Sequence, residues 1–140
     1  MQRRTFGNSY ATRDRLARGL MLLAALGAFT AFIGSIGAVG MAGSDTQQVE
    51  TWRMLGFVMF TGVFLLLAVA PRKYPGLWEL VVLNKAALTV AEVALALNDA
   101  SAAATSAAVD GILTVLILTA YVLGRGYESW WPRRQRSMVG

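Results

Sequence analysis

Four long apolar runs alternate with short polar segments along this chain of 140 residues. The runs cover about residues 19–42, 52–70, 76–97 and 106–123. A helix of about 20 predominantly apolar residues is needed to cross the hydrocarbon core of a bilayer. Because each run is close to that length, the pattern predicts a single all-α domain, an integral membrane bundle of four transmembrane helices.

The first run is too long for the core of a secretory signal peptide. Residues 19–42 contain no charged residue, whereas the apolar region of a signal peptide has about 7–15 residues. We therefore expect an uncleaved spanning helix that follows a basic tail, residues 1–18.

The charges outside the runs predict the topology. Eleven of the thirteen Lys and Arg residues lie in the tail of residues 1–18, in the turn between the second and third runs, or in the tail of residues 124–140. The other two connections, residues 43–50 and 98–105, read as loops that contain acidic but no basic residues. Because basic segments stay on the cytoplasmic side, we expect a multi-pass protein of the inner (cytoplasmic) membrane with both termini inside the cell.

Composition removes several classes of chemistry. The chain has no cysteine and no histidine, so disulfides, thiol nucleophiles and imidazole ligands to zinc or haem are excluded. It has no phosphate-binding loop and no catalytic motif of the common hydrolase or protease types. The net charge of +5 is not gathered on a recognisable nucleic-acid-binding motif. The expected surrounding is the lipid bilayer, and neither a cofactor, a metal nor a nucleic acid is predicted.

The third run carries charges that lipid rarely surrounds, namely Glu79, Lys85 and Glu92. Such residues usually face the interior of a bundle and pair there. At a rise of 1.5 Å per residue, Glu79 lies about one turn from the cytoplasmic end. We expect it at the membrane surface, beside the basic residues of the turn or of the C-terminal tail.

The deeper charges are predicted to meet an acidic residue of the fourth run. Lys85, Thr89 and Glu92 lie at i, i+4 and i+7, on one helix face. Asp110 and Thr114 lie at i and i+4 on the next helix. If the two helices are antiparallel neighbours, Glu92 and Asp110 have similar depths. The sequence therefore predicts a cluster of Lys85, Glu92 and Asp110, with two hydroxyls, inside the bundle.

Different interpretations of this cluster remain open. It could be a polar clamp that fixes the register of two helices. It could instead be catalytic, with Glu92 and Asp110 as acid and base and Lys85 tuning them. That chemistry suits isomerisation, epoxide opening or cyclisation of a lipophilic small molecule. A third possibility is proton-coupled transport of a small molecule.

Small residues recur at every fourth position of the first run, in the rows Gly27, Ala31, Ser35 and Gly34, Ala38. Small residues let helix backbones approach closely in lipid. The rows could form a seam with a partner protein or with a second copy of the chain, and we favour packing against the chain's own helices.

Tryptophans lie near the ends of the runs, at Trp52, Trp78, Trp130 and Trp131. Tryptophan is enriched where membrane helices meet the water interface, so these four are predicted to be interfacial anchors.

The stretch of residues 56–92, GFVMFTGVFLLLAVAPRKYPGLWELVVLNKAALTVAE, resembles the middle of small four-helix bacterial membrane proteins of the DoxX-like kind. Those proteins have a second helix that ends in a basic Pro/Arg turn and a third helix with polar residues. The resemblance implies the fold more than the function, since that group includes subunits of quinone-linked oxidoreductases among other members. No functional residue is carried over from it.

Together these features favour a non-enzymatic membrane subunit or accessory protein that packs in a larger membrane complex. The small membrane enzyme and the transporter are the alternatives.

Overall fold

The structure is a computed structural model, and it describes residues 3–98 and 101–131. These residues form four α-helices and one short 3-10 helix, namely α1 (Arg3–Met41), α2 (Ser44–Val69), α3 (Leu77–Ala96), α4 (Ser101–Gly124) and η1 (Gly126–Trp130). No strand occurs among them. The prediction of an all-helical fold with four helices is confirmed.

Three of the helices are long and apolar enough to cross a membrane. The qualifying segments are Tyr10–Met41 of α1, Ser44–Val69 of α2 and Ala104–Gly124 of α4. Helix α3 has 20 residues, which is sufficient length, but it contains Glu79, Lys85 and Glu92. Of the four helices, α3 therefore depends most on contacts with other parts of a protein if it is to lie in a membrane.

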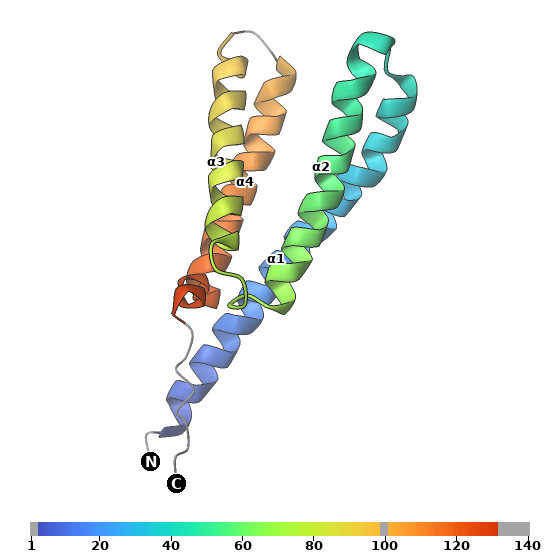
Figure 1. Cartoon of the computed structure of the whole chain (residues 1–140). Helices are drawn as coiled ribbons and strands as arrows, with labels where there is room; N and C mark the ends of the chain where they lie inside the picture. The colour runs from blue at the N-terminus through green and yellow to red at the C-terminus, as the bar shows by residue number, and fades with distance from the viewer. Residues whose placement is uncertain (1–2, 99–100, 132–140) are drawn as a thin grey trace.

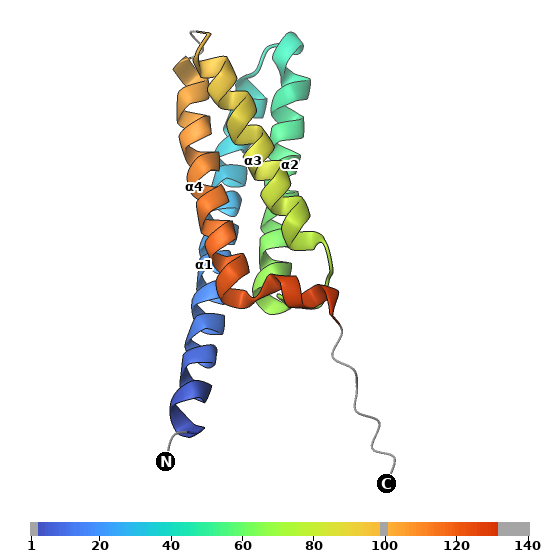
Figure 2. The same cartoon turned by 90° about the vertical axis from the view of Figure 1, so that its left-hand side faces the viewer.

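The helices form two antiparallel hairpins. Helix α1 packs along α2, α3 packs along α4, and contacts between α1 and α4 join the hairpins. Figure 1 shows the hairpins close together at the end that holds the α2–α3 turn and diverging toward their two tips. The first turns of α1 extend beyond the other helices at the joined end (Figures 1 and 2).

The helices extend beyond the apolar runs, so the expected loops are shorter than predicted. Helix α2 begins at Ser44 and α4 at Ser101, and most of the segments 43–50 and 98–105 is helical. Likewise, most of the basic tail, residues 1–18, belongs to α1. Hydropathy marks the length that lies in lipid, whereas a helix continues into water until a residue breaks it. Gly43, which is extended at φ −69° and ψ 163°, is such a break.

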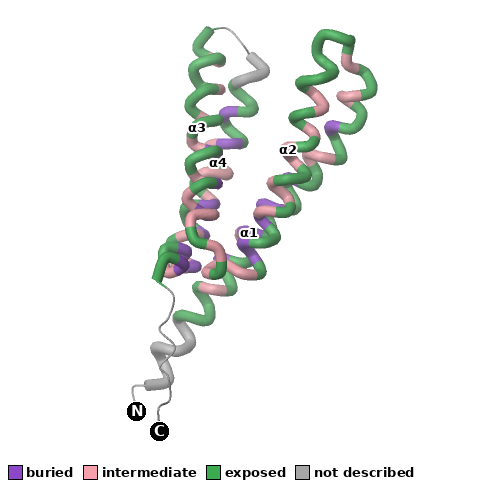
Figure 3. The backbone as a smooth tube through the Cα atoms, viewed as in Figure 1, coloured by how far each residue is buried: buried purple, intermediate pink, exposed green. Residues whose placement is uncertain are grey.

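Small side chains line the buried side of α1. Buried positions recur at spacings of 4 and 3 residues, at Ala17, Met21, Ala24 and Ala28, and Ser35 continues the row. Such a row keeps one narrow face against the neighbouring helices. The outward sides of all four helices are exposed (Figure 3), as expected where lipid replaces water.

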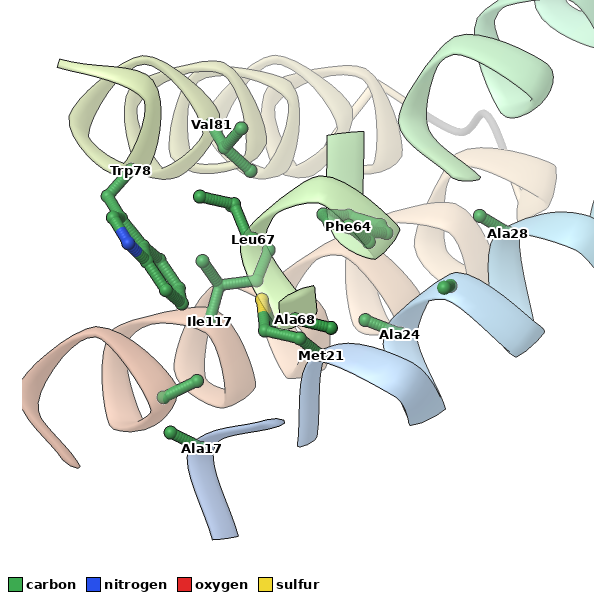
Figure 4. Packing of buried hydrophobic residues seen from close by; sticks show 12 residues of the cluster. Ala17, Met21, Ala24, Ala28, Phe64, Leu67, Ala68, Trp78, Val81 and Ile117 are labelled. Atoms are coloured by element: carbon green, nitrogen blue, oxygen red, sulfur yellow. The ribbon is translucent and has the colours of Figure 1, made fainter. Parts of the chain in front are cut away.

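The tightest packing lies at the joined end of the hairpins. Side chains from all four helices are fully buried there, namely Met21, Phe64, Leu67, Trp78 and Ile117. Figure 4 shows these side chains packed together between the helices. The Trp78 indole Nε1 donates a hydrogen bond of 2.7 Å to the carbonyl oxygen of Pro71, which fixes the start of α3 against the turn.

Candidate functional site

Lys85 of α3 and Asp110 of α4 form a buried ion pair. Lys85 Nζ lies 2.8 Å from Asp110 Oδ1, and the two residues are 6% and 8% exposed. A charged donor and a charged acceptor at this distance make a strong hydrogen bond. The structure thus brings together two members of the predicted cluster.

Helix α2 covers a further side of this pair. Lys85 Nζ lies 4.6 Å from the centre of the Phe60 ring, a distance at which the ring face attracts a cation. The ammonium group is therefore held by a carboxylate on one helix and an aromatic ring on another.

The two threonines of the predicted cluster do not bind its charges. Thr89 Oγ1 donates to the backbone oxygen of Lys85, and Thr114 Oγ1 donates to that of Asp110, each at 2.8 Å. The expectation of two hydroxyls at the charges is wrong. The carbonyl one turn earlier is the nearest acceptor for a helical threonine, and in lipid it has no competitor.

Glu92 stands outside the ion pair. Its side chain is half-buried, and its Oε2 is shielded from solvent without a hydrogen-bond partner among the described residues. The predicted group of three therefore consists of one neutral ion pair and one further carboxyl on the same face of α3.

Two hollows occur on the described surface. One, of about 650 Å³, is an apolar hollow on α4 and α1, with Gly111, Val115 and Leu20 in its wall. The other, of about 670 Å³, lies between the α2–α3 turn and the region of η1. Neither is lined by Lys85, Glu92 or Asp110.

Glu79 lies at the joined end but does not pair with a basic residue there. Its Oε1 accepts hydrogen bonds from Tyr121 Oη at 2.8 Å and from Trp130 Nε1 at 3.1 Å. Glu79 thus lies at the expected end, where its partner Trp130 shares a hollow with Arg72 and Lys73, but it makes no ion pair with a basic residue of the described part of the chain. Sequence reasoning missed these aromatic donors because η1 folds back over the start of α3, and no pattern in the sequence predicts that fold.

Two basic residues at this end, Arg72 and Arg125, are engaged with other acids. Arg72 Nε donates a hydrogen bond of 2.9 Å to the backbone oxygen of Gly124, and its guanidinium group also binds Asp14. Arg125 Nη1 lies 3.1 Å from Glu128 Oε1. Arg72 thus fastens the turn to α1 and to the end of α4, which the sequence did not predict.

Three of the four tryptophans are exposed, as interfacial anchors would be, namely Trp52, Trp130 and Trp131. Trp78 is fully buried, so the prediction that it anchors at the interface is wrong. Its indole nitrogen finds its partner inside the protein, at Pro71, and needs no headgroup.

The small residues of α1 divide into two groups. Ser35 is buried, and its Oγ donates a hydrogen bond of 2.7 Å to the backbone oxygen of Phe32. Ala31 and Ala38 are half-buried. Gly27 and Gly34 are exposed, and a methyl group added at either would meet no atom within 4 Å. Packing within the chain therefore uses only part of the predicted rows.

No group of three or more acidic, histidine or cysteine residues among the described residues is arranged to hold a metal. No family model, no curated protein and no solved structure matches this chain. The resemblance of residues 56–92 to DoxX-like proteins therefore stays a prediction.

Proposed function

We propose that this protein is a non-enzymatic subunit or accessory protein of a larger complex in the inner membrane. In this proposal α3 is the fourth spanning helix, and both termini face the cytoplasm. The observation that carries the proposal is the polar side chain that α3 directs away from its own bundle.

That side chain is Asn84, which lies near the middle of α3 and is exposed. Among the atoms that the structure describes, its amide has no hydrogen-bond partner. An amide in apolar surroundings without a hydrogen bond costs about 2–7 kcal/mol. A neighbouring transmembrane helix is the usual source of such a bond in lipid.

The surroundings of Asn84 on α3 suit a helix as the neighbour. Leu80, Asn84, Ala87 and Ala91 are all exposed and follow one another at spacings of 4, 3 and 4 residues. This spacing keeps one narrow face toward a partner helix, and the two alanines allow a close approach. We call Leu80, Asn84, Ala87 and Ala91 the α3 seam.

Two of the three charged residues of α3, Glu79 and Lys85, have partners inside the chain, which supports its passage through the membrane. The third, Glu92, makes no ion pair among the described residues. Lys85 is neutralised by Asp110. Glu79 receives two hydrogen bonds at the joined end of the hairpins. The basic residues of the α2–α3 turn and of the N-terminal part of α1 lie at that same end, which supports a cytoplasmic position for it under the positive-inside rule.

The ion pair also favours the clamp over the catalytic interpretation. A carboxylate that binds an ammonium at 2.8 Å is poorly placed to take a proton from a substrate. The two surface hollows described above have no wall formed by Glu92 or Asp110, so neither of these hollows would hold a substrate against that pair of carboxyls.

The test is affinity purification of the tagged protein from its native membrane in mild detergent. We expect one or a few larger membrane proteins to co-purify with the wild type and to be lost with Asn84→Leu. Asn98→Leu is the matched control, because it makes the same change at the end of α3, where Asn98 Nδ2 already bonds to the oxygen of Ala94. Recovery of the wild type as a monomer without a protein partner would contradict the proposal.

A further inference from the structure

The hollow at the joined end lies at the level where spanning helices end. Its walls are Arg72, Lys73 and Pro75 of the α2–α3 turn and residues 128–131, which follow α4. Helices α2 and α4 both qualify as membrane spans and end at Val69 and Gly124. A hollow built by the segments that directly follow two spans lies at the depth of the lipid headgroups.

The residues that line the hollow carry one net positive charge, from Arg72 and Lys73 against Glu128. Glu79, which accepts a hydrogen bond from Trp130, is a further acid at this end and is not among the lining residues. Glu128 lies 3.1 Å from Arg125 and 3.6 Å from Arg72, and Arg72 also binds Asp14. These two acids offset the two arginines. Lys73 makes no ion pair within the described residues, and its Nζ lies only beside a ring, 5.5 Å from the centre of Tyr74.

Arg72 is rigidly placed in this wall. Its Nε donates to the oxygen of Gly124 and its Nη2 to Asp14, which leaves Nη1 without a hydrogen bond among the described residues. A guanidinium held in this way loses little side-chain freedom when it binds an anion. Arg72 and Lys73 together therefore offer one donor that is held in place and one that is exposed.

Residues 129–131 supply the remaining features of a headgroup site. Trp130 and Trp131 are exposed, and their indole rings suit the region between acyl chains and water. Ser129 is 6% exposed, and its Oγ has no hydrogen-bond partner among the described residues. Ser129 also lines the hollow, so its unpaired hydroxyl is a candidate donor to an anion bound there.

We propose that this hollow binds the phosphate of a phospholipid that carries a single net negative charge. The phosphodiester would accept hydrogen bonds from Lys73 and Arg72. Its single negative charge matches the single net positive charge of the residues that line the hollow. Trp130 and Trp131 would contact the glycerol and upper acyl region. The proposal rests on the cytoplasmic position proposed for the joined end, because anionic lipids are enriched at the cytoplasmic surface.

The test uses the full chain, purified in detergent and titrated with phosphatidylglycerol, phosphatidylcholine or glycerol phosphate, with bound lipid counted by native mass spectrometry. We expect one phosphatidylglycerol to bind to the wild type more tightly than phosphatidylcholine does. Lys73→Gln should weaken that binding by about fivefold. Arg53→Gln, which removes one charge from the other half of α2, should leave it unchanged.

Three outcomes would overturn the proposal. Equal binding of both lipids would show that the hollow does not select an anion. Equal loss with Lys73→Gln and Arg53→Gln would show only a general effect of net charge. Displacement by glycerol phosphate at the concentration that phosphatidylglycerol needs would show a site for a soluble phosphate. Thermal unfolding of each variant shows whether a loss of lipid binding results from misfolding. If Lys73→Gln misfolds, Lys73→Arg is used instead, and it should retain lipid binding if the proposal holds.

This titration contains no protein partner. Its failure would therefore leave the proposed role as a subunit standing, and absence of a partner in the purification would leave the lipid site standing.

Discussion

At the scale of single residues, the buried pair of Lys85 and Asp110 affects stability most strongly when only one of its two charges is removed. Both charges have left water, and the attraction between them offsets that cost only while both are present. Removal of one partner leaves the other charged in apolar surroundings. The clamp interpretation therefore makes a prediction about stability, and the catalytic interpretation does not.

Asp110→Asn should lower the free energy of unfolding by about 3–5 kcal/mol. The double variant Lys85→Met, Asp110→Leu should recover most of that loss, since it removes both charges and keeps apolar volume. Unfolding in detergent micelles, followed by circular dichroism, measures both. Asp45→Asn, at an exposed acid in the first turn of α2, is the control and should change stability by no more than about 1 kcal/mol. Equal stabilities of the single variant and the wild type would contradict the clamp.

Gly126 provides a second residue-level prediction, because the chain turns there against two aromatic rings. A Cβ at this position would lie 2.5 Å from the ring of Tyr121 and 2.7 Å from that of Trp78. Gly126→Ala should therefore destabilise the protein by about 1–3 kcal/mol. Gly62→Ala is the matched control, because a Cβ on Gly62 would meet nothing within 4 Å. A melting temperature that falls equally in both variants would show that the packing at Gly126 is not the cause.

At the scale of elements, α3 shows what hydropathy and helical spacing can and cannot predict. The apolar runs predicted the existence of the helices, and the rise per residue placed Lys85 and Asp110 at depths where they could meet. Depth alone does not determine the direction in which a side chain points around the helix axis. That direction depends on packing, so the burial of Trp78, the partners of Glu79 and the separation of Glu92 from the ion pair could not be read from spacing.

The residues at which the helices begin and end could not be predicted from hydropathy either. The apolar runs begin inside α1 and α2, several residues after each helix begins, because the backbone hydrogen bonds of a helix are satisfied whether its side chains are apolar or polar. The break at Gly43 is a backbone feature, and glycines also occur within the helices of this chain. Composition could therefore not single out the glycine that ends a helix.

Labelling of introduced cysteines tests whether α3 crosses the membrane. The chain has no natural cysteine, so Gln48→Cys, Lys73→Cys and Asn98→Cys each report one position. With intact cells and a thiol reagent that does not cross membranes, we expect labelling at positions 48 and 98. Position 73 should react only after the membrane is opened. Labelling of 73 and 98 from the same side would contradict a crossing by α3.

At the scale of the whole molecule, the two hairpins are fastened at one end and diverge toward the other (Figure 1). The joined end contains the fully buried side chains, the contacts of Arg72 and the hollow proposed to bind a lipid phosphate. The diverging part contains Glu92, whose Oε2 has no partner among the described residues, and the outward amide of Asn84 marks the middle of α3. The joined end is the more tightly packed of the two, and the unpaired amide of Asn84 and the unpaired Oε2 of Glu92 fit the proposal that α3 packs against another membrane protein.

The most direct test of that claim is photo-cross-linking in the native membrane from a photoreactive residue at position 87, in the α3 seam. The matched control carries the same residue at position 26, where the side chain of Leu26 is exposed on α1. We predict a discrete adduct with a larger membrane protein from position 87 that disappears with Asn84→Leu, and no such adduct from position 26. Absence of a protein adduct from position 87, or an adduct of two copies of this chain alone, would contradict the account.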